Sequence, residues 1–599
     1  MKKTILLNLL LGGVLVASAQ SSTICNEVGT VTFKYKNDNA KEVLVDVQFA
    51  GRNPMTRDAE GVWSATLGPA APDMYPYCFI VDGMSVMDPD NDQYFPNEGF
   101  KNSLLEIPAK DGSLIHDIKD VPHGAVEYIR YYSGSLGATN NAIVYLPPSY
   151  FEDPERKYPV FYLISGTTDT EEVYYKVGRV NYILDNLIAN GDAEEMIVVL
   201  PYGNPTELLP SPPQNMMAMG DVFGKDLTTD LMPYIESHYR TINDSDHRAI
   251  GGFSRGGNQG LACGLTNLDK FSYLCSYSSF TSTELPEVYD NAEDTNDKIN
   301  LFWLGVGTDD FLYGNARDYM EFLDKKGIRS VKEYTNDKFG HTWMNAKYFL
   351  DKTLRLLFRQ EAAEEAMKNG QPALAATGNE PQFTPGVMAR LFPRPIISPE
   401  YKKDGVVFRF KAPESEKVML VAECLSEPLA MQRDDDGVWE AEINEAVPDI
   451  FTYYFSVDGT PVADPQNMYI SPSVGFKPSI CSRPDNHYNF ASMGANVAHG
   501  KVRYDLNDGT STYIPANFDE IDGKAATVRL IPGKDDTAES WFKVGGVDAL
   551  ADAMIAEKIC QPVKLTTSPV ETDLVIKADD YTTWDERRNA LEKLLQEIK

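Results

Sequence analysis

The chain has 599 residues, too many for a single hydrophobic core, so we expect three or four domains. Its formal net charge is −33, and the acidic residues are spread along the chain rather than gathered in one tail. This charge disfavours nucleic acid and anionic membranes as partners, and it indicates a solvated surface or, as the alternative, an acidic groove for a cationic ligand.

The first 19 residues have the layout of a secretory signal peptide. Lys2 and Lys3 precede an apolar run, residues 5–16, and residues 17–19 (Ala-Ser-Ala) supply a cleavage site. The run is too short to cross a bilayer, and no later run of about twenty apolar residues follows. We therefore expect a secreted or periplasmic bacterial protein without membrane insertion.

The seven cysteines are sparse, odd in number and without metal-ligand spacing. The sequence therefore predicts no metal site, and most of the thiols are expected to be small buried groups. Cys25 and Cys78 are the one pair that we consider for a disulfide, because export permits oxidation.

Residues 20–118 are expected to form a small antiparallel β-sandwich, since residues 31–35 alternate apolar and polar side chains between Gly, Asp and Pro turns. The segment recurs 376 residues later, where Trp439 matches Trp63. This repeat indicates a duplication. Sugar stacking is the alternative role for the two tryptophans, but a half-buried core position suits their strands better.

The pattern of apolar and polar residues changes near residue 119. Apolar runs at residues 160–164, 196–200, 249–252 and 301–306 alternate with helical stretches, as in a parallel sheet with crossover helices. Residues 119–362 are therefore expected to form an α/β domain.

A nucleophile motif lies inside this domain, at residues 252–256 (Gly-Phe-Ser-Arg-Gly). A strand precedes Ser254 and a helix from Asn258 follows it, which is the setting of a nucleophile elbow. The alternative is a glycine-rich turn with an incidental serine. We expect Ser254 to be a catalytic nucleophile.

A serine nucleophile needs a base and an orienting carboxylate. His341 follows the last predicted strands, and Asp310 directly follows residues 301–306, so both are expected at the same sheet edge as Ser254. Asp309 is the alternative acid, and either aspartate could instead cap the next helix. His123 has a counterpart, His499, in the second half and is expected to be structural.

An oxyanion needs fixed N–H donors. The backbone amides of Arg255, next to the nucleophile, and of Thr167, in the loop after residues 160–164, are the expected donors. The Arg255 side chain either binds a substrate oxygen or pairs with a neighbouring carboxylate.

The second half repeats the first with a gap. Residues 363–398 are expected to be a linker, 399–494 a second β-sandwich and 495–599 a copy of the esterase-like region that lacks 126 residues. The missing stretch contains the elbow and the acid, and Thr582 stands where His341 would be. Because this remnant lacks central strands, we expect it to pack on the α/β domain.

Taken together, residues 144–148, 158–160, the Ser254 elbow, Asp310 and His341 resemble carbohydrate esterase family 1, the esterase D-like branch of the α/β-hydrolases. The first sandwich resembles a family 48 carbohydrate-binding module. Departures are Ser165 where many members have His, and Arg255 where many have Met. The resemblance covers roughly residues 120–360.

The resemblance implies a cofactor-free serine esterase that removes feruloyl or acetyl groups from plant xylan. Two alternatives remain open. Enterochelin esterases also join a β-sandwich to such a domain, so the substrate is alternatively a siderophore or other small ester. The second alternative is that the chain is a non-catalytic glycan-binding protein with two inactive esterase regions.

Overall fold

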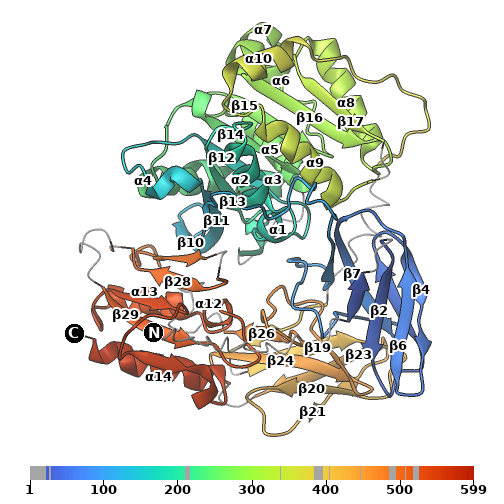
Figure 1. The fold of residues 1–599 in the computed structure, drawn as a ribbon, viewed down its shortest axis with the longest axis vertical. Coiled ribbons are helices and arrows are strands. Elements are labelled where there is room, and N and C mark those ends of the chain that lie inside the picture. Colours follow the sequence, from blue (N-terminus) through green and yellow to red (C-terminus); the bar gives the residue numbers. More distant parts are fainter. Residues whose placement is uncertain are drawn as a thin grey trace, which may run out of the picture.

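The computed structural model describes residues 22–25, 29–208, 216–336, 339–383, 396–403, 405–444, 447–483, 494–505, 508–516, 518 and 525–598. The expected signal peptide, residues 1–19, lies outside them. Figure 1 shows a large α/β unit, two neighbouring all-β units and a smaller C-terminal α/β unit. No helix within the described ranges combines the length and apolarity that crossing a bilayer requires.

The first all-β unit consists of two antiparallel sheets packed face to face. Their order is β1-β2-β6-β5 and β4-β3-β7-β8, with β9 on β7. Phe33 and Tyr35 of β2 meet Tyr77 and Phe79 of β7 with ring centroids 5.3 and 4.7 Å apart. The strands are β1 Thr23–Cys25, β2 Val31–Lys36, β3 Val43–Val47, β4 Gly51–Pro54, β5 Thr56–Arg57, β6 Val62–Leu67, β7 Asp73–Val81, β8 Met84–Val86 and β9 Ser103–Ile107.

The second all-β unit repeats this arrangement as β18-β19-β23-β22 and β21-β20-β24-β25, with β26 on β24. Trp63 and Trp439 are each 8% exposed, and their indole N–H groups donate to the carbonyls of Asn37 and Ala412. Both tryptophans are therefore core residues. The strands are β18 Glu400–Lys402, β19 Gly405–Lys411, β20 Val418–Ala422, β21 Leu429–Ala430, β22 Gln432–Arg433, β23 Val438–Ile443, β24 Ile450–Val457, β25 Thr460–Val462 and β26 Ser479–Ser482.

The prediction of a disulfide between Cys25 and Cys78 is wrong, because both thiols are free. Cys25 lies on β1, and its thiol faces the carbonyl of Glu106. Cys78 lies on β7 of the other sheet, where burial raises its pKa. The two side chains therefore belong to different sheets.

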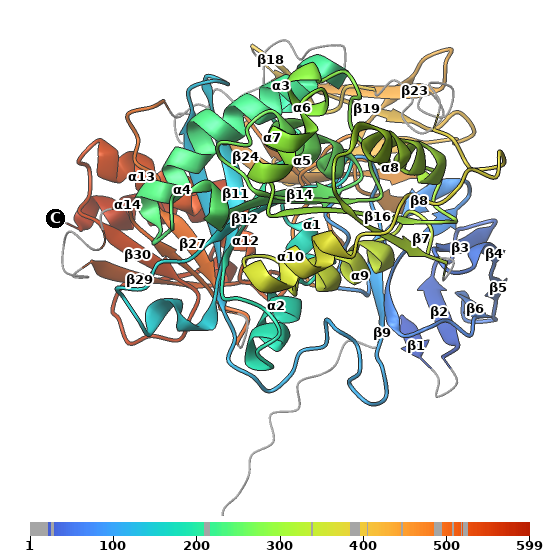
Figure 2. The ribbon, with the colours of Figure 1, turned by 90° about the horizontal axis from the view of Figure 1, so that it is seen from above.

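A single sheet of 13 strands forms the middle of the molecule, in the order β17-β16-β15-β14-β12-β13-β11-β10-β27-β28-β30-β29-β31. The strands from β12 to β17 pair in parallel, as the buried apolar runs predict. Helices α2, α9 and α10 cover one face, and α3, α4, α5 and α8 cover the other (Figure 2).

The elements of this α/β unit have the following bounds. The strands are β10 Ala125–Ser133, β11 Ala138–Leu146, β12 Val160–Ile164, β13 Ile197–Pro201, β14 Arg248–Phe253, β15 Tyr273–Tyr277, β16 Leu301–Gly307 and β17 Val331–Thr335. The helices are α1 Val173–Lys176, α2 Val180–Ala189, α3 Met216–Asp226, α4 Met232–His238, α5 Arg255–Leu265, α6 Pro286–Tyr289, α7 Ala292–Lys298, α8 Tyr313–Lys326, α9 Trp343–Leu354 and α10 Gln360–Lys368.

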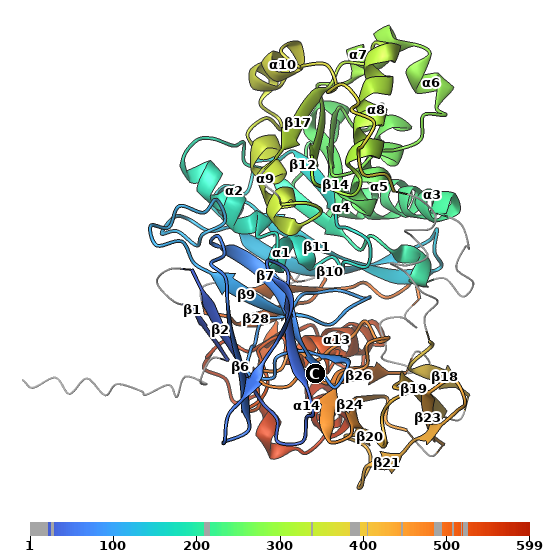
Figure 3. The same cartoon turned by 90° about the vertical axis from the view of Figure 1, so that its right-hand side faces the viewer.

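The C-terminal unit extends the same sheet. Strand β27 pairs antiparallel with β10, so that Glu127 faces Arg503 in the register. Figure 3 shows this unit directly beneath β10 and β11. Its elements are β27 Lys501–Tyr504, β28 Ser511–Ile514, β29 Ala526–Ile531, α12 Ser540–Lys543, α13 Val547–Ala556, β30 Val563–Thr566, β31 Val575–Lys577 and α14 Trp584–Glu597.

The boundary expected at residue 362 falls inside α10. Ala363 and Met367 of this helix are buried in the core of the α/β unit. Residues 371–383 then return along α8, where the amide of Gly314 donates to the carbonyl of Pro381 at 3.0 Å. Much of the expected linker is thus part of the α/β unit, because its apolar and hydrogen-bonding groups have partners there. Residues 384–395 lie outside the described residues.

Candidate active site

Ser254 stands on a sharp turn between β14 and α5. Its backbone has φ 59° and ψ −121°, a conformation that is strained for any residue with a Cβ. Glycine is required on both sides: a Cβ at Gly252 or at Gly256 would collide with the carbonyl oxygen of Ile164. The turn therefore presents the Ser254 hydroxyl at the carboxyl edge of the sheet.

The structure brings Ser254, His341 and Asp310 together. The Ser254 Oγ lies 2.8 Å from His341 Nε2, and His341 Nδ1 lies 2.9 and 3.0 Å from the two Asp310 oxygens. An ionised carboxylate only accepts, so Nδ1 donates to Asp310 and Nε2 is left to accept the Ser254 proton. Asp310 is fully buried and also accepts the amide of Leu312 at 2.8 Å, whereas Asp309 is exposed.

Two phenylalanine rings contact the His341 imidazole, and the sequence analysis did not single them out. Phe253 stacks on it with centroids 4.7 Å apart, and Phe311 lies 4.4 Å away. Phe253 is 4% exposed and is braced by Trp343, whereas Phe311 is half-buried. Each phenylalanine adjoins a predicted site residue in sequence, and that adjacency is the signal that would have found them.

The loop after β12 lies beside Ser254. A Cβ built on Gly166 would come within 3.6 Å of the Ser254 Cβ, and Thr167, the expected amide donor, is the next residue. Asp169 accepts the amide of Gly166 at 3.2 Å, which fixes the curvature of the loop. The place of Thr167 therefore suits an oxyanion donor, as does that of Arg255 at the first position of α5.

The first sandwich holds this loop from outside. Asn97 donates to Asp169 Oδ1 at 2.8 Å, and the amide of Glu98 donates to the carbonyl of Thr168 at 2.7 Å. The Glu98 carboxylate in turn accepts from Tyr202 and Asn204 of the α/β unit. Sequence patterns did not reveal this role, because a contact between two domains leaves no local signature.

Arg255 lies against Gly203, with its guanidinium inside the protein rather than in open solvent. Burial raises the pKa of Asp169 to about 7, and the Arg255 charge opposes this rise. Of the two roles considered for the Arg255 side chain, this position favours pairing with a carboxylate. Glu171 is buried nearby, and burial raises its pKa to about 7 as well.

The C-terminal unit has a corresponding loop at Gly533 and Lys534. There the carboxylate of Asp579 accepts the amide of Lys534 at 3.3 Å, the position equivalent to Thr167. Thr582, in place of His341, donates its hydroxyl to Glu586 at 2.7 Å. The Lys534 amide of the C-terminal unit is thus already bound by Asp579, a carboxylate of the same unit.

Three further histidines have structural partners. His123 and His499 each contact a buried aspartate, Asp185 and Asp552, at 2.9 and 3.2 Å. His247 pairs with Asp244 at the surface. No group of three His, Cys, Asp or Glu side chains in the described parts of the chain is arranged to hold a metal ion.

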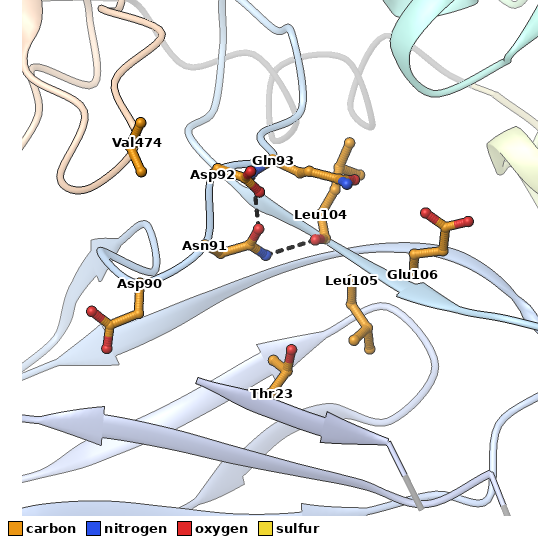
Figure 4. Close-up of a pocket in the computed structure, with 9 residues that line it drawn as sticks. All are labelled: Thr23, Asp90, Asn91, Asp92, Gln93, Leu104, Leu105, Glu106 and Val474. Atoms are coloured by element: carbon orange, nitrogen blue, oxygen red, sulfur yellow. Dashed lines mark hydrogen bonds between the residues drawn. The ribbon is translucent and has the colours of Figure 1, made fainter. Parts of the chain in front are cut away.

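Two cavities lie where the sandwiches meet, away from Ser254. The larger, about 300 Å³, is bounded by the first sandwich and by Val474 of the second (Figure 4). At its wall, the side-chain amide of Asn91 donates to the carbonyl of Leu104 at 2.7 Å. None of its lining residues belongs to the Ser254 site.

Sequence comparison shows two kinds of similarity. Residues 133–342 match a family model described as "Putative esterase". The chain is 28% identical over 346 residues to an endo-1,4-beta-xylanase/feruloyl esterase of Xylanibacter ruminicola, which covers 57% of this chain and 46% of that protein. It is also 28% identical over 265 residues to endo-1,4-beta-xylanase Y of Acetivibrio thermocellus, covering 40% and 23%. The chain thus spans less than half the length of these relatives.

Solved structures with similar folds include a ferulic acid esterase of Anaeromyces mucronatus in complex with ferulic acid, 23% identical, with a TM-score of 0.36 and coverage of 43% of this chain and 97% of that one. The enterobactin esterase of Shigella flexneri is 17% identical, with a TM-score of 0.43 and coverage of 59% and 99%. Both TM-scores lie below 0.5, and the proposals below rest on the sequence matches and the site geometry.

The central unit is an α/β-hydrolase domain. It has the parallel sheet, the strained turn at Ser254, and a histidine and an aspartate at the same sheet edge. The esterase family match spans all three of these residues. The central unit is a carboxylic ester hydrolase.

Proposed function

We propose that this protein is a secreted serine esterase that removes feruloyl or acetyl side groups from plant cell-wall xylan. The observation that carries the catalytic part is the continuous hydrogen-bonded path from Ser254 Oγ through His341 to Asp310. The substrate part rests on the similarity to a xylanase/feruloyl esterase. The signal-like first 19 residues support export.

The site supports a two-step acyl transfer. Ser254 Oγ attacks the acyl carbon while His341 Nε2 takes its proton, and the same proton then goes to the departing alcohol oxygen. In the second step, water attacks the acyl carbon and gives a proton to Nε2. Nε2 passes this proton to Ser254 Oγ as the bond between the acyl carbon and Oγ breaks, and the acid is released. Asp310 holds the imidazole in the required tautomer and stabilises its charge, and the amides of Thr167 and Arg255 stabilise the oxyanion.

The remaining units take non-catalytic roles in this proposal. The C-terminal unit is a truncated esterase copy that serves as packing surface, because Asp579 engages the loop amide that an oxyanion would need. The two sandwiches are immunoglobulin-like modules of the carbohydrate-binding type, and binding of the Ser254→Ala chain to insoluble xylan tests that assignment. If neither sandwich binds a glycan, their role is structural only.

Hydrolysis of methyl ferulate, acetylated xylan and p-nitrophenyl acetate by wild type and Ser254→Ala tests the proposed activity. The wild type is expected to cleave at least one plant-type ester, and Ser254→Ala to lose that activity by several orders of magnitude. Inactivity of the wild type on all three, or equal activity of the variant, would contradict the proposal. Cleavage of a catecholate siderophore ester and of none of these three substrates would instead assign the protein to the hydrolases of small esters.

A further inference from the structure

The segment between the α/β unit and the second sandwich reaches the active site. Its last described residue, Phe383, is half-buried, with its ring 5.7 Å from that of Phe311. Phe311 itself lies 4.4 Å from the His341 imidazole. An aromatic row therefore runs from His341 outward through Phe311 to Phe383.

Several hydrogen bonds to α8 and its neighbours hold this segment in place. Ala373 donates its amide to Asp324 at 2.7 Å, and Arg317 donates to the carbonyl of Leu374 at 3.3 Å. The amide of Phe383 donates to the Asn315 side chain at 2.7 Å. A side chain at Gly314 would collide with the segment, so the helix has a glycine where the segment crosses it. Hydrogen bonds to α8 at Ala373 and Leu374, and again at Phe383, thus fix the position of Phe383.

The chemistry of the reaction decides which part of the substrate meets this row. His341 Nε2 must protonate the departing oxygen, so the alcohol half of the ester lies on the His341 side of Ser254. The oxyanion donors lie instead at the loop beside Gly166. Because Phe253 is buried, the partly exposed aromatic surface beside His341 in the described ranges belongs to Phe311, and Phe383 continues it.

We propose that Phe311 and Phe383 form a stacking platform for the sugar ring of the departing alcohol. One face of a pyranose or furanose ring is lined by C–H groups, and this apolar face suits a flat aromatic surface. The inference rests on the proposed function and extends it: the inter-domain segment supplies a residue that selects esters of sugars over esters of small alcohols.

The test compares two esters with the same acyl group, feruloyl arabinose and methyl ferulate, in the full chain. Phe383→Ala is expected to lower the ratio of kcat/KM for feruloyl arabinose to that for methyl ferulate about fivefold, mainly through KM. Phe383→Tyr, which keeps the ring, should retain the wild-type ratio. Leu374→Ala, an exposed apolar residue of the same segment, is the matched control and should also retain it.

Four results would overturn the platform. Unchanged kcat/KM values for both esters in Phe383→Ala would show that its ring does not meet the sugar, and equal losses for both esters would assign it to support of His341. A loss of ratio in Leu374→Ala as large as in Phe383→Ala would assign the effect to docking of the segment. Failure of the wild type to cleave feruloyl arabinose, methyl ferulate, acetylated xylan and p-nitrophenyl acetate alike would overturn the proposed function and the platform together.

Discussion

At the residue scale, the reactivity of Ser254 depends on groups that cannot move. The positive φ of Ser254 leaves its hydroxyl at the sheet edge, and Asp310 is held by the Leu312 amide as well as by His341. Phe253 fixes one side of the imidazole. Fixed donors and acceptors of this kind lose little energy to reorganisation during the reaction.

Asp310→Asn should lower kcat for p-nitrophenyl acetate by on the order of 10³–10⁴-fold, because an amide no longer selects the His341 tautomer that accepts the Ser254 proton. The apparent Tm should change little. Asp309→Asn is the matched control, since Asp309 is exposed and adjacent. Loss of activity in Asp309→Asn with retention in Asp310→Asn would exchange the two assignments.

The buried Glu171 should make stability depend on pH. Its folded pKa of about 7 lies above the ordinary 4.5, so its contribution is present at low pH and is lost as pH rises through about 7. Glu171→Gln cannot ionise and should show a smaller fall in apparent Tm between pH 6 and pH 8 than the wild type. An exposed control, Glu60→Gln, should follow the wild type. A steeper fall for Glu171→Gln would contradict the assignment.

At the element scale, ion pairs join the α/β unit to the C-terminal unit. We call Glu172, Lys176, Glu539 and Lys543 the inter-unit cluster. Lys176 pairs with Glu539 at 2.9 Å, and Lys543 pairs with Glu172, so each unit supplies one lysine and one glutamate. Although burial alone would raise it, the two lysines hold the pKa of Glu539 below its ordinary value.

Removing one lysine from the inter-unit cluster leaves a largely buried carboxylate with less compensation. Lys543→Met should therefore lower the apparent Tm by several degrees, on the order of 5 °C. Lys298→Met, which breaks an exposed pair with Asp294, should shift it by about a degree or less. Equal shifts in the two variants would show that the cluster contributes no more than a surface pair.

Local patterns predicted much of the fold and of the site, and contacts between distant segments account for the rest. The run at residues 160–164 is strand β12, and the motif at Ser254 forms a turn between strand and helix. The bracing by Asn97 and the docking of Phe383 arise from segments far apart in the chain, without periodicity to reveal them. The linker prediction failed for residues 363–383 because Ala, Pro, Gly and Gln are typical of linkers, whereas the contacts of this segment with the α/β unit leave no mark in its composition.

At the scale of the whole molecule, the α/β unit and the C-terminal unit share one sheet, which β10 and β27 join. Glu127 of β10 is fully buried and accepts from Arg503 and Lys501 of β27, at 2.7 and 3.0 Å. A closed junction of this kind leaves no free edge at β10. The C-terminal unit therefore covers a strand edge that would otherwise be available for pairing with another chain.

A chain restricted to residues 20–398 retains Ser254, His341 and Phe383 but exposes β10. It should be less soluble than the full chain and should self-associate with rising concentration, because an uncovered strand is a template for pairing. Size-exclusion chromatography with light scattering measures this. A monodisperse monomer as stable and active as the full chain would show that the C-terminal unit has no packing role.

Covalent labelling with a fluorophosphonate, read by intact mass and peptide mapping, tests most directly whether Ser254 is the nucleophile of a single esterase site. The reagent phosphonylates an activated serine, so we expect one group per chain, attached to Ser254, and none on His341→Ala. No labelling of the wild type, attachment to another residue, or a second label in the C-terminal unit would contradict a single esterase site at Ser254.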